Sequence, residues 1–510
     1  MNAKLSSGLV YLSILVIAVC GIIYELIIGA VSSYLWGDSI YYFSVTIGLY
    51  MSAMGLGAFV SRFARDKLFD WFVGSEILIG LAGGVSALLL FWFYAETEFY
   101  EYAFVFITVL IGMLVGIEIP LLIRLLESQE DLRENVANVL TYDYVGGLIG
   151  ALLFPLFLLP QLGLIRTAMV LGLSNLAIAL INFVRHRQFL HYFKSLSVFA
   201  LLVATGLIYG VWQSPVLESA MEQRLYRDQV IASVRTPYQH LVVTQWHKDI
   251  RLFINGGLQF SSLDEHRYHE SLIHPAMAFN HKAKNILVLG GGDGLAVREL
   301  LRYPGLESID LVDIDPEMTR MFREHPRLKA LNQDSLSHEA LTIHHKDAYK
   351  FAENSVDFYD VVFVDLPDPS QTALSKLYSV GFYELLKKRL RPGGAIVVQS
   401  TSPFFAPEAF WCVHQTLAAT GLQVFPYQVD VPSFGNWGFQ MATESDLKPD
   451  TLSFAPGLNL KDLRFLNTAT LRSLFAMPKD LQRDLDTIQP STLMQPVILN
   501  YYERGWNGIR

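Results

Sequence analysis

Two carboxylates three positions apart, Asp365 and Asp368, follow an apolar run in the stretch VFVDLPDP at residues 362–369. Paired carboxylates attract cations and can accept protons. The same stretch is also typical of a strand that ends in a turn. Its meaning therefore depends on the residues that precede it in the chain.

Acidic residues follow four successive apolar runs of the kind expected for buried strands. The runs NILVLGG, IDLVDID, LTIHH and YDVVFVD end in or run into Asp293, Asp313, Asp347 and Asp365. In open α/β sheets, ligands bind beyond the carboxyl ends of the strands. One such aspartate fits a solvated loop, but four in register indicate a ligand pocket.

The residues of this edge indicate an adenosyl ligand without phosphates. The turn GGGDG does not match G-x-G-x-x-G, which disfavours NAD, although its glycines allow a ligand close to the backbone. Asp313 stands where a carboxylate can accept hydrogen bonds from ribose hydroxyls. Asp347 can accept a hydrogen bond from the exocyclic amine of adenine. Asp293 and Asp365 would attract a sulfonium and an amine but repel a carboxylate, which favours decarboxylated S-adenosylmethionine.

The elements that position these acids alternate between strand and helix from residue 285 onward, which predicts a parallel, doubly wound α/β sheet. Residues 230–261 read as short antiparallel strands. We therefore expect a small β-domain and a Rossmann-like domain, followed by a C-terminal extension in which no chemistry is evident. The predicted domains are residues 1–215, 216–275, 276–445 and 446–510.

The first predicted domain is a multi-span α-helical membrane domain. Hydrophobic residues make up 52% of the chain and charged residues only 17%, and the excess lies in the first part. A bilayer core needs roughly 20 apolar residues per helix. Seven segments meet this criterion, at residues 8–33, 40–61, 71–95, 102–126, 143–160, 164–184 and 196–213.

Three acids, Glu25, Glu118 and Asp143, lie within or beside these apolar segments. An ionisable group there indicates either function or a structural hydrogen bond. The net charge of −9 argues against nucleic-acid binding, and the two cysteines, Cys20 and Cys412, provide neither a disulfide framework nor a metal site.

The charged residues between the apolar segments and the number of segments give conflicting predictions of which side of the membrane the globular part occupies. Basic residues follow the second, fourth and sixth segments, and acidic ones follow the third. The positive-inside rule and seven crossings would place the globular part outside the cell. The adenosyl donor is made inside cells, so we expect a multi-pass protein of the cell membrane with its catalytic domain facing the cytoplasm.

The motifs of residues 230–445 resemble those of spermidine synthases, the polyamine aminopropyltransferase family. GGGDG, VDIDP, KDA and D-x-x-D-P followed by KLYS occur in that family's order, with TPYQH and DEHRYHESLIHP upstream. GIIYELI and GLYMSAMGLGAF resemble its membrane-attached branch. The resemblance implies transfer of an aminopropyl group from decarboxylated S-adenosylmethionine, as a co-substrate, to an amine such as putrescine, and relatives are often homodimers.

The resemblance also assigns roles to individual residues. It implies Asp365 as the general base, with Tyr268 as a second catalytic residue. The donor would be held by Gln239, Gly291, Asp293, Asp313, Asp347 and Ala348. The amine would be held by His269, Asp293, Asp365, Asp368 and Gln399. No metal and no prosthetic group are expected.

Two stretches depart from the soluble members of that family. Leu366-Pro367 separates the two aspartates where small hydroxyl residues are usual, and Pro432-Ser433-Phe434 replaces a PTYP-like motif. The amine acceptor therefore stays open between putrescine, a longer polyamine and a lipid headgroup amine. Two other readings also stay open: an S-adenosylmethionine-dependent methyltransferase, and a membrane polyamine transporter or sensor.

Overall fold

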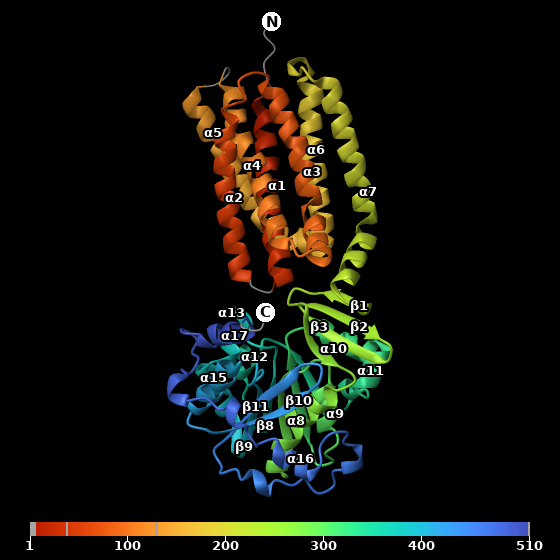
Figure 1. The fold of residues 1–510 in the computed structure, drawn as a ribbon, viewed down its shortest axis with the longest axis vertical. Helices are drawn as coiled ribbons and strands as arrows, with labels where there is room; N and C mark the ends of the chain where they lie inside the picture. The colour runs from red at the N-terminus through yellow and green to blue at the C-terminus, as the bar shows by residue number, and fades with distance from the viewer. Residues whose placement is uncertain (1–6, 37–38, 128–130, 508–510) are drawn as a thin grey trace. The chain divides into compact units, whose positions relative to one another are not determined.

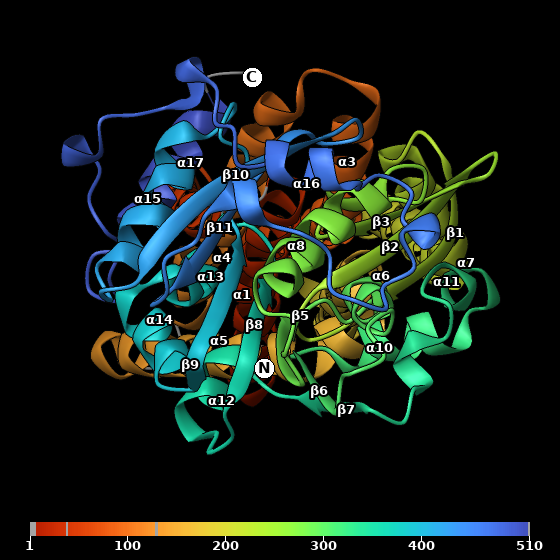
Figure 2. The ribbon, with the colours of Figure 1, turned by 90° about the horizontal axis from the view of Figure 1, so that it is seen from below.

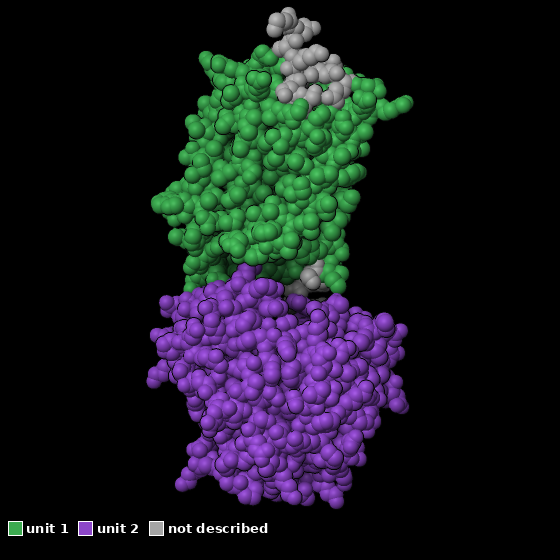
Figure 3. Space-filling view, turned by 180° about the vertical axis from the view of Figure 1, so that it is seen from behind, with its two compact units in different colours: residues 1–228 green, residues 229–510 purple. Residues whose placement is uncertain are grey.

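The computed structural model describes residues 7–36, 39–127 and 131–507 of the chain. The chain divides into two compact units, residues 1–228 and 229–510, shown in two colours in Figure 3. The first unit is helical, and the second contains both sheets. Helix α7 runs past residue 215 as far as Leu225, and three residues separate its end from Gln229, where the second unit begins.

The helical unit consists of long apolar helices, and six of the seven predicted segments lie on one helix each (Figure 1). The predicted segment 143–160 instead runs from α5 through a π-helical turn (Phe154–Leu158) to the start of α6. Apolar side chains over the whole length of these segments favour helices buried against one another or in lipid. The helices are α1 (Ser7–Trp36), α2 (Ser39–Ser61), α3 (Leu68–Glu96), α4 (Tyr100–Leu126), α5 (Leu132–Leu153), α6 (Leu159–Arg185) and α7 (Phe193–Leu225).

A break in the backbone lies at Gly163, within the first turns of α6. Gly163 has a φ of 71°, which interrupts the helical stretch between residues 132 and 185. Before the break, Gly146 and Gly150 of α5 follow α1 in the same direction. After it, Gly172 of α6 approaches Gly80 and Gly84 of α3, and the contacts show that α6 runs antiparallel to α3. The chain therefore reverses direction near Gly163.

By length and composition, the described residues contain six helical stretches that are apolar enough to cross a membrane, with residues 132–185 counted as one. Small residues let these helices approach one another closely. A Cβ on Gly116 of α4 would lie 2.1 Å from the Met54 carbonyl oxygen of α2. Glycine is therefore required at this contact.

The second unit begins with a four-stranded antiparallel meander, as the alternation in residues 230–261 predicts. Its strands lie in the order β1-β2-β3-β4. They are β1 (Gln229–Arg235), β2 (His240–Trp246), β3 (Asp249–Ile254) and β4 (Gly257–Ser261).

A seven-stranded sheet follows, in the order β10-β11-β9-β8-β5-β6-β7. The five predicted strands are parallel to one another, and two later strands pair antiparallel at one edge. The strand order reverses between β5 and β8, which is where such folds bind ligands. The strands are β5 (Asn285–Gly290), β6 (Ser308–Asp313), β7 (Leu341–His345), β8 (Tyr359–Asp365), β9 (Leu390–Gln399), β10 (Gln423–Val431) and β11 (Gly435–Thr443).

Helices cover both faces of this sheet, as Figure 2 shows. One apolar cluster joins α8, α9 and α10 to one face of the sheet, and another joins α12, α14 and α15 to the other. This two-layered core is the doubly wound arrangement expected from the sequence. The helices are α8 (Glu265–Phe279), α9 (Leu295–Leu300), α10 (Pro316–Glu324), α11 (Pro326–Leu331), α12 (Ala348–Asn354), α13 (Thr372–Ser375), α14 (Val380–Lys387), α15 (Pro407–Ala418), α16 (Thr468–Ser473) and α17 (Val497–Asn507).

Candidate active site

Asp365 stands at the end of β8, in register with Gly290 at the end of β5. Gly290 has a φ of 84°, and a Cβ there would lie 2.0 Å from the Asp365 carbonyl oxygen. Only glycine fits both the left-handed conformation and the contact. The Asp365 side chain turns toward the next residue of the loop, because a Cβ on Gly291 would lie 3.1 Å from Oδ2. The glycine turn therefore lies directly beside the predicted base.

Helix α8 brings a phenol to the same carboxylate. The Tyr268 hydroxyl donates a hydrogen bond of 2.6 Å to Asp365 Oδ1. Burial raises the pKa of Asp365, while the positive charge of His269 and this hydrogen bond lower it. The pKa of Tyr268 is raised well above its usual value by burial and by the charge of Asp365. Tyr268 therefore acts as a hydrogen-bond donor and stays protonated.

Asp293 completes an acidic pair with Asp365. Burial raises the pKa of Asp293 to about 6, with His269 lowering it and Asp365 raising it further. Asp293 Oδ1 also accepts a hydrogen bond from the Leu295 amide at 2.8 Å. Two partly buried carboxylates near each other repel one another unless a cation or a proton lies between them.

His269 supplies a positive charge beside this pair. It is buried, and its Nδ1 lies 2.9 Å from Glu265 Oε2. Burial alone would lower the pKa of His269, but the hydrogen bond and charge of Glu265 raise it to about 9. Arg298 also bonds both oxygens of Glu265 at 2.9 Å. His269 is therefore a fixed imidazolium at neutral pH.

Asp368, which follows Leu366-Pro367 in the chain, accepts hydrogen bonds from several side chains. Gln399 Nε2 donates to Oδ1 at 3.1 Å, and the Thr401 hydroxyl donates to Oδ2 at 3.0 Å. Tyr502 of α17 adds a third hydrogen bond. Burial raises the pKa of Asp368, and all three bonds lower it. The carboxylate is therefore held in one orientation, beyond Asp365 along the same loop.

Asp313 holds the glycine turn in place. Its Oδ2 accepts from the Gly292 amide at 3.0 Å, and its Oδ1 accepts from the Asp315 amide at 2.9 Å. Burial raises its pKa to about 6, and these backbone bonds lower it. Each carboxylate oxygen can accept a second hydrogen bond, so Asp313 retains acceptor capacity for a ligand hydroxyl.

Gln239 reaches the sheet from the turn between β1 and β2. Its Nε2 donates to Asp315 Oδ2 at 2.9 Å, and the Thr236 hydroxyl donates to the same oxygen at 2.9 Å. Asp315 is fully buried and caps α10 by accepting from the Glu317 amide. The meander is thus fastened to the ligand edge of the sheet beside Asp313.

Asp347 caps α12, accepting from the amides of Tyr349 and Lys350. Lys376 Nζ also lies 2.6 Å from Asp347 Oδ2. Burial raises the pKa of Asp347, but Lys376 and the helix amides lower it overall. The following residue, Ala348, is buried in the α12 side of the core. Asp347 is therefore ionised, and its oxygens accept hydrogen bonds from the helix amides and from Lys376.

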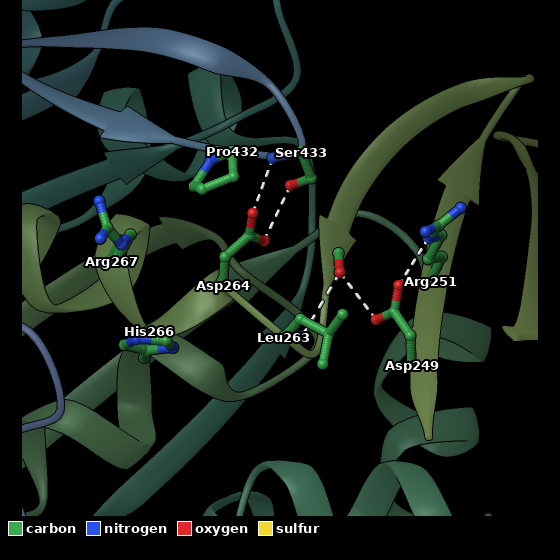
Figure 4. A pocket seen from close by; sticks show the side chains of 9 residues that line it. Asp249, Arg251, Leu263, Asp264, His266, Arg267, Pro432 and Ser433 are labelled. Atoms are coloured by element: carbon green, nitrogen blue, oxygen red, sulfur yellow. Dashed lines mark hydrogen bonds and ion pairs between the residues drawn. The ribbon is translucent and has the colours of Figure 1, made fainter. Parts of the chain in front are cut away.

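A surface cleft lies at the start of α8, beside the stretch that departs from the soluble spermidine synthases (Figure 4). Asp264, which precedes α8, accepts from the Ser433 amide at 2.7 Å and from its hydroxyl at 2.8 Å. In the same cleft, Asp249 accepts from Arg251 Nε at 2.7 Å. The β10–β11 turn is therefore anchored to the helix that carries Tyr268 and His269.

Four residues of this site were not identified in the sequence analysis: Glu265, Asp315, Thr401 and Tyr502. A signal exists for Asp315, because an acid directly before a proline is a helix N-cap pattern. Glu265 stands four residues before His269, the spacing of neighbours on a helix. Thr401 and Tyr502 carry no local signal, since only the tertiary fold brings them to Asp368. The C-terminal extension, in which no chemistry was expected, thus contributes Tyr502.

Comparisons with known proteins identify relatives of this chain. A family model described as the spermine/spermidine synthase domain matches residues 265–453. The chain is 40% identical to a polyamine aminopropyltransferase of Leptospira interrogans, covering 98% of this chain and 99% of that protein. It is 43% identical to polyamine aminopropyltransferase 2 of Ralstonia nicotianae, covering 99% of both chains. Both likenesses include the helical unit as well as the α/β unit.

A solved structure also matches part of the chain. It is a crystal structure of spermidine synthase in complex with the transition state analogue AdoDATO. It is 20% identical, covers 51% of this chain and 89% of that chain, and gives a TM-score of 0.45.

Proposed function

The chain belongs to the polyamine aminopropyltransferase family and is a transferase, and we propose that it makes spermidine from putrescine. The aminopropyl group comes from decarboxylated S-adenosylmethionine, the co-substrate of this family. The observation that carries the proposal is the grouping of Asp365, Asp293 and Tyr268 beside the glycine turn. This arrangement suits two substrates that are both cations, a sulfonium donor and an ammonium acceptor.

The proposed reaction is an in-line displacement. A primary amine nitrogen attacks the methylene next to the sulfonium, a new C–N bond forms, and the C–S bond breaks to release methylthioadenosine. An alkylammonium has a pKa near ~10 and is not nucleophilic until it loses a proton. Asp365 accepts that proton, and the two reactants are held at reacting distance by the carboxylates around them.

The remaining residues divide the site between the two substrates. Asp313, Gly291, Gln239 and the Asp347-Ala348 pair would bind the thioadenosine part. Asp293 and His269 would bind the aminopropyl arm and the attacking amine. Asp368, fixed by Gln399 and Thr401, would bind the distal ammonium of the diamine. The stiff Leu366-Pro367 spacer sets the offset between the two carboxylates.

A product assay tests this proposal. Purified full-length protein is incubated with putrescine and either decarboxylated or intact S-adenosylmethionine, and methylthioadenosine and spermidine are measured. We expect both products with the decarboxylated donor only. Methyl transfer from the intact donor would instead support the methyltransferase reading, which the acidic pair disfavours. A panel with spermidine and ethanolamine lipids in place of putrescine identifies the amine acceptor.

A polyamine transporter or sensor would bind ligand in the second unit without turnover. The hydrogen-bonded base Asp365 favours catalysis over this reading. Complementation of cells that lack spermidine distinguishes the two. A catalytic role predicts that Asp365→Asn, expressed at wild-type level in membranes, fails to restore growth. Restored growth with no measurable transfer would support transport or sensing.

We also propose that the helical unit spans the cell membrane and that the second unit faces the cytoplasm, where the donor is made. The long apolar helices support membrane insertion. Met494 of the second unit is 92% exposed, and both native cysteines are buried. A Met494→Cys variant should therefore react with a membrane-impermeant maleimide in lysed cells and not in intact ones. Equal labelling of intact cells would place this unit outside.

A further inference from the structure

Two fully buried carboxyl groups face each other inside the helical unit. Glu76 of α3 and Glu118 of α4 are both 0% exposed, and their side chains lie within hydrogen-bonding range of each other. Apart from that mutual contact, no oxygen of either group has a hydrogen-bond donor among the described residues. Each residue lies about 12 Å along its helix from the end where the loops carry basic residues.

Further polar groups without partners among the described residues lie on α1 and α6, which pack against α3. The Tyr24 hydroxyl of α1 is buried and unpaired in the described part of the chain, and it lies in electrostatic range of both carboxyls. Asn175 of α6 is 1% exposed, and neither of its amide atoms is bonded within the same ranges. Its Cβ lies 3.7 Å from the Cβ position of Gly80, one turn along α3 from Glu76.

A further acid lies near the pair, because Asp143 of α5 is in electrostatic range of Glu118. Burying an isolated carboxylate in an apolar environment is strongly unfavourable, and two of them also repel each other. Carboxylate oxygens without donors are satisfied by a ligand that is positively charged and donates hydrogen bonds.

We propose that Glu76 and Glu118, together with Tyr24 and Asn175, bind a primary ammonium group within the helical unit. An alkylammonium carries three donors and no acceptor, which matches this set of oxygens. No group of three or more His, Cys, Asp or Glu residues among those described is placed to hold a metal ion. The site is separate from the catalytic pocket, so it does not depend on the proposed reaction.

Equilibrium binding of radiolabelled putrescine to the full-length protein in phosphatidylcholine nanodiscs tests the site. We expect about two bound diamines per chain for the wild type, and about one for Glu76→Gln and Glu118→Gln. Glu101→Gln, an exposed acid on the same helix as Glu118, is the matched control and should keep wild-type binding. Aminopropyl transfer should be unchanged in all three variants, which separates this site from the catalytic one.

A measurement on the wild type avoids any folding defect of the variants. An apolar carbodiimide modifies carboxyl groups in membranes, and mass spectrometry follows its reaction at Glu76 and Glu118. We expect putrescine to slow both modifications, whereas equimolar sodium or potassium should not. Unchanged modification at saturating putrescine, protection by the alkali ions, or wild-type binding in both glutamine variants would overturn the proposal. Each of these results would mean that the two carboxyls share only a proton or bind a simple ion.

Discussion

The Tyr268 hydroxyl and Asp365 Oδ1 are joined by a 2.6 Å hydrogen bond. The bond fixes the carboxylate and lowers its pKa against the effect of burial. The other oxygen, Oδ2, is directed toward Gly291 of the glycine turn. One oxygen of Asp365 is thus used for orientation, while the other faces the predicted donor site.

Asp365→Asn should abolish proton acceptance while keeping the shape of the side chain. We expect kcat to fall about 10²–10⁴-fold, the usual contribution of a general base. Binding of methylthioadenosine, measured by calorimetry, should change little. A kcat within a factor of two of the wild type would exclude Asp365 as the base.

Tyr268→Phe should raise the pKa of Asp365, because it removes a hydrogen bond to the ionised form. We expect the acidic limb of the kcat–pH profile to move to higher pH, with a roughly tenfold loss of kcat at pH 7. The pH profile is the informative measurement, since a merely structural defect would lower kcat equally at all pH values.

Tyr502→Phe should weaken the hold on Asp368 without touching Asp365. We expect KM for putrescine to rise about threefold to tenfold, corresponding to one hydrogen bond to a charged group, with a smaller change in KM for the donor. Tyr501→Phe, on the same helix, is the control. Equal effects of the two substitutions would indicate that α17 acts through packing alone.

Asp293→Asn should stabilise the ligand-free protein at neutral pH. The folded-state pKa of Asp293 is raised to about 6, so its contribution to stability is present below about pH 4 and lost as pH rises through 6. We expect Tm at pH 7.5 to rise by about 2–6 °C, while transfer activity falls at least ~10-fold. Asp357→Asn, at an exposed position, should change neither.

His269→Gln should show a pH dependence of the same sign in a higher pH window. The folded-state pKa of His269 is raised to about 9, so its stabilising pair with Glu265 is fully present below pH ~6.5 and lost as pH rises through 9. The Tm difference between wild type and variant should therefore be largest near pH 6 and shrink by pH 9.5. A difference that stays constant over this range would contradict a charged His269.

The parallel part of the sheet and its ligand edge were predictable from local patterns. The apolar runs ending in Asp293, Asp313 and Asp365 carry both the strand signal and the site signal, because parallel strands bring their carboxyl ends to one edge. Strands β10 and β11 were not predicted, since FPYQVDV and GNWGFQM alternate too irregularly to be distinguished from loops. Their pairing depends on the free edge of β9.

The contacts of Glu76 and Thr401 could not be predicted from local sequence patterns. Glu118 was recognised as an acid in an apolar segment, but Glu76 meets it only because α3 and α4 pack side by side. Thr401 has a φ of 57°, a conformation rare for β-branched residues that no sequence pattern indicates. It is held there by contacts such as the bond to Asp368, as is common for strained residues near functional sites.

Only the residues 226–228 lie between the last residue of α7 and the first strand of the meander. A link of this length spans at most about 10–14 Å. If the helical unit inserts in the membrane as proposed, this link would tether the second unit to the bilayer. Anionic lipids concentrate di- and polycations at the membrane surface. The amine concentration that governs turnover would then depend on the lipid composition of the membrane and on ionic strength, as well as on the cellular polyamine pool.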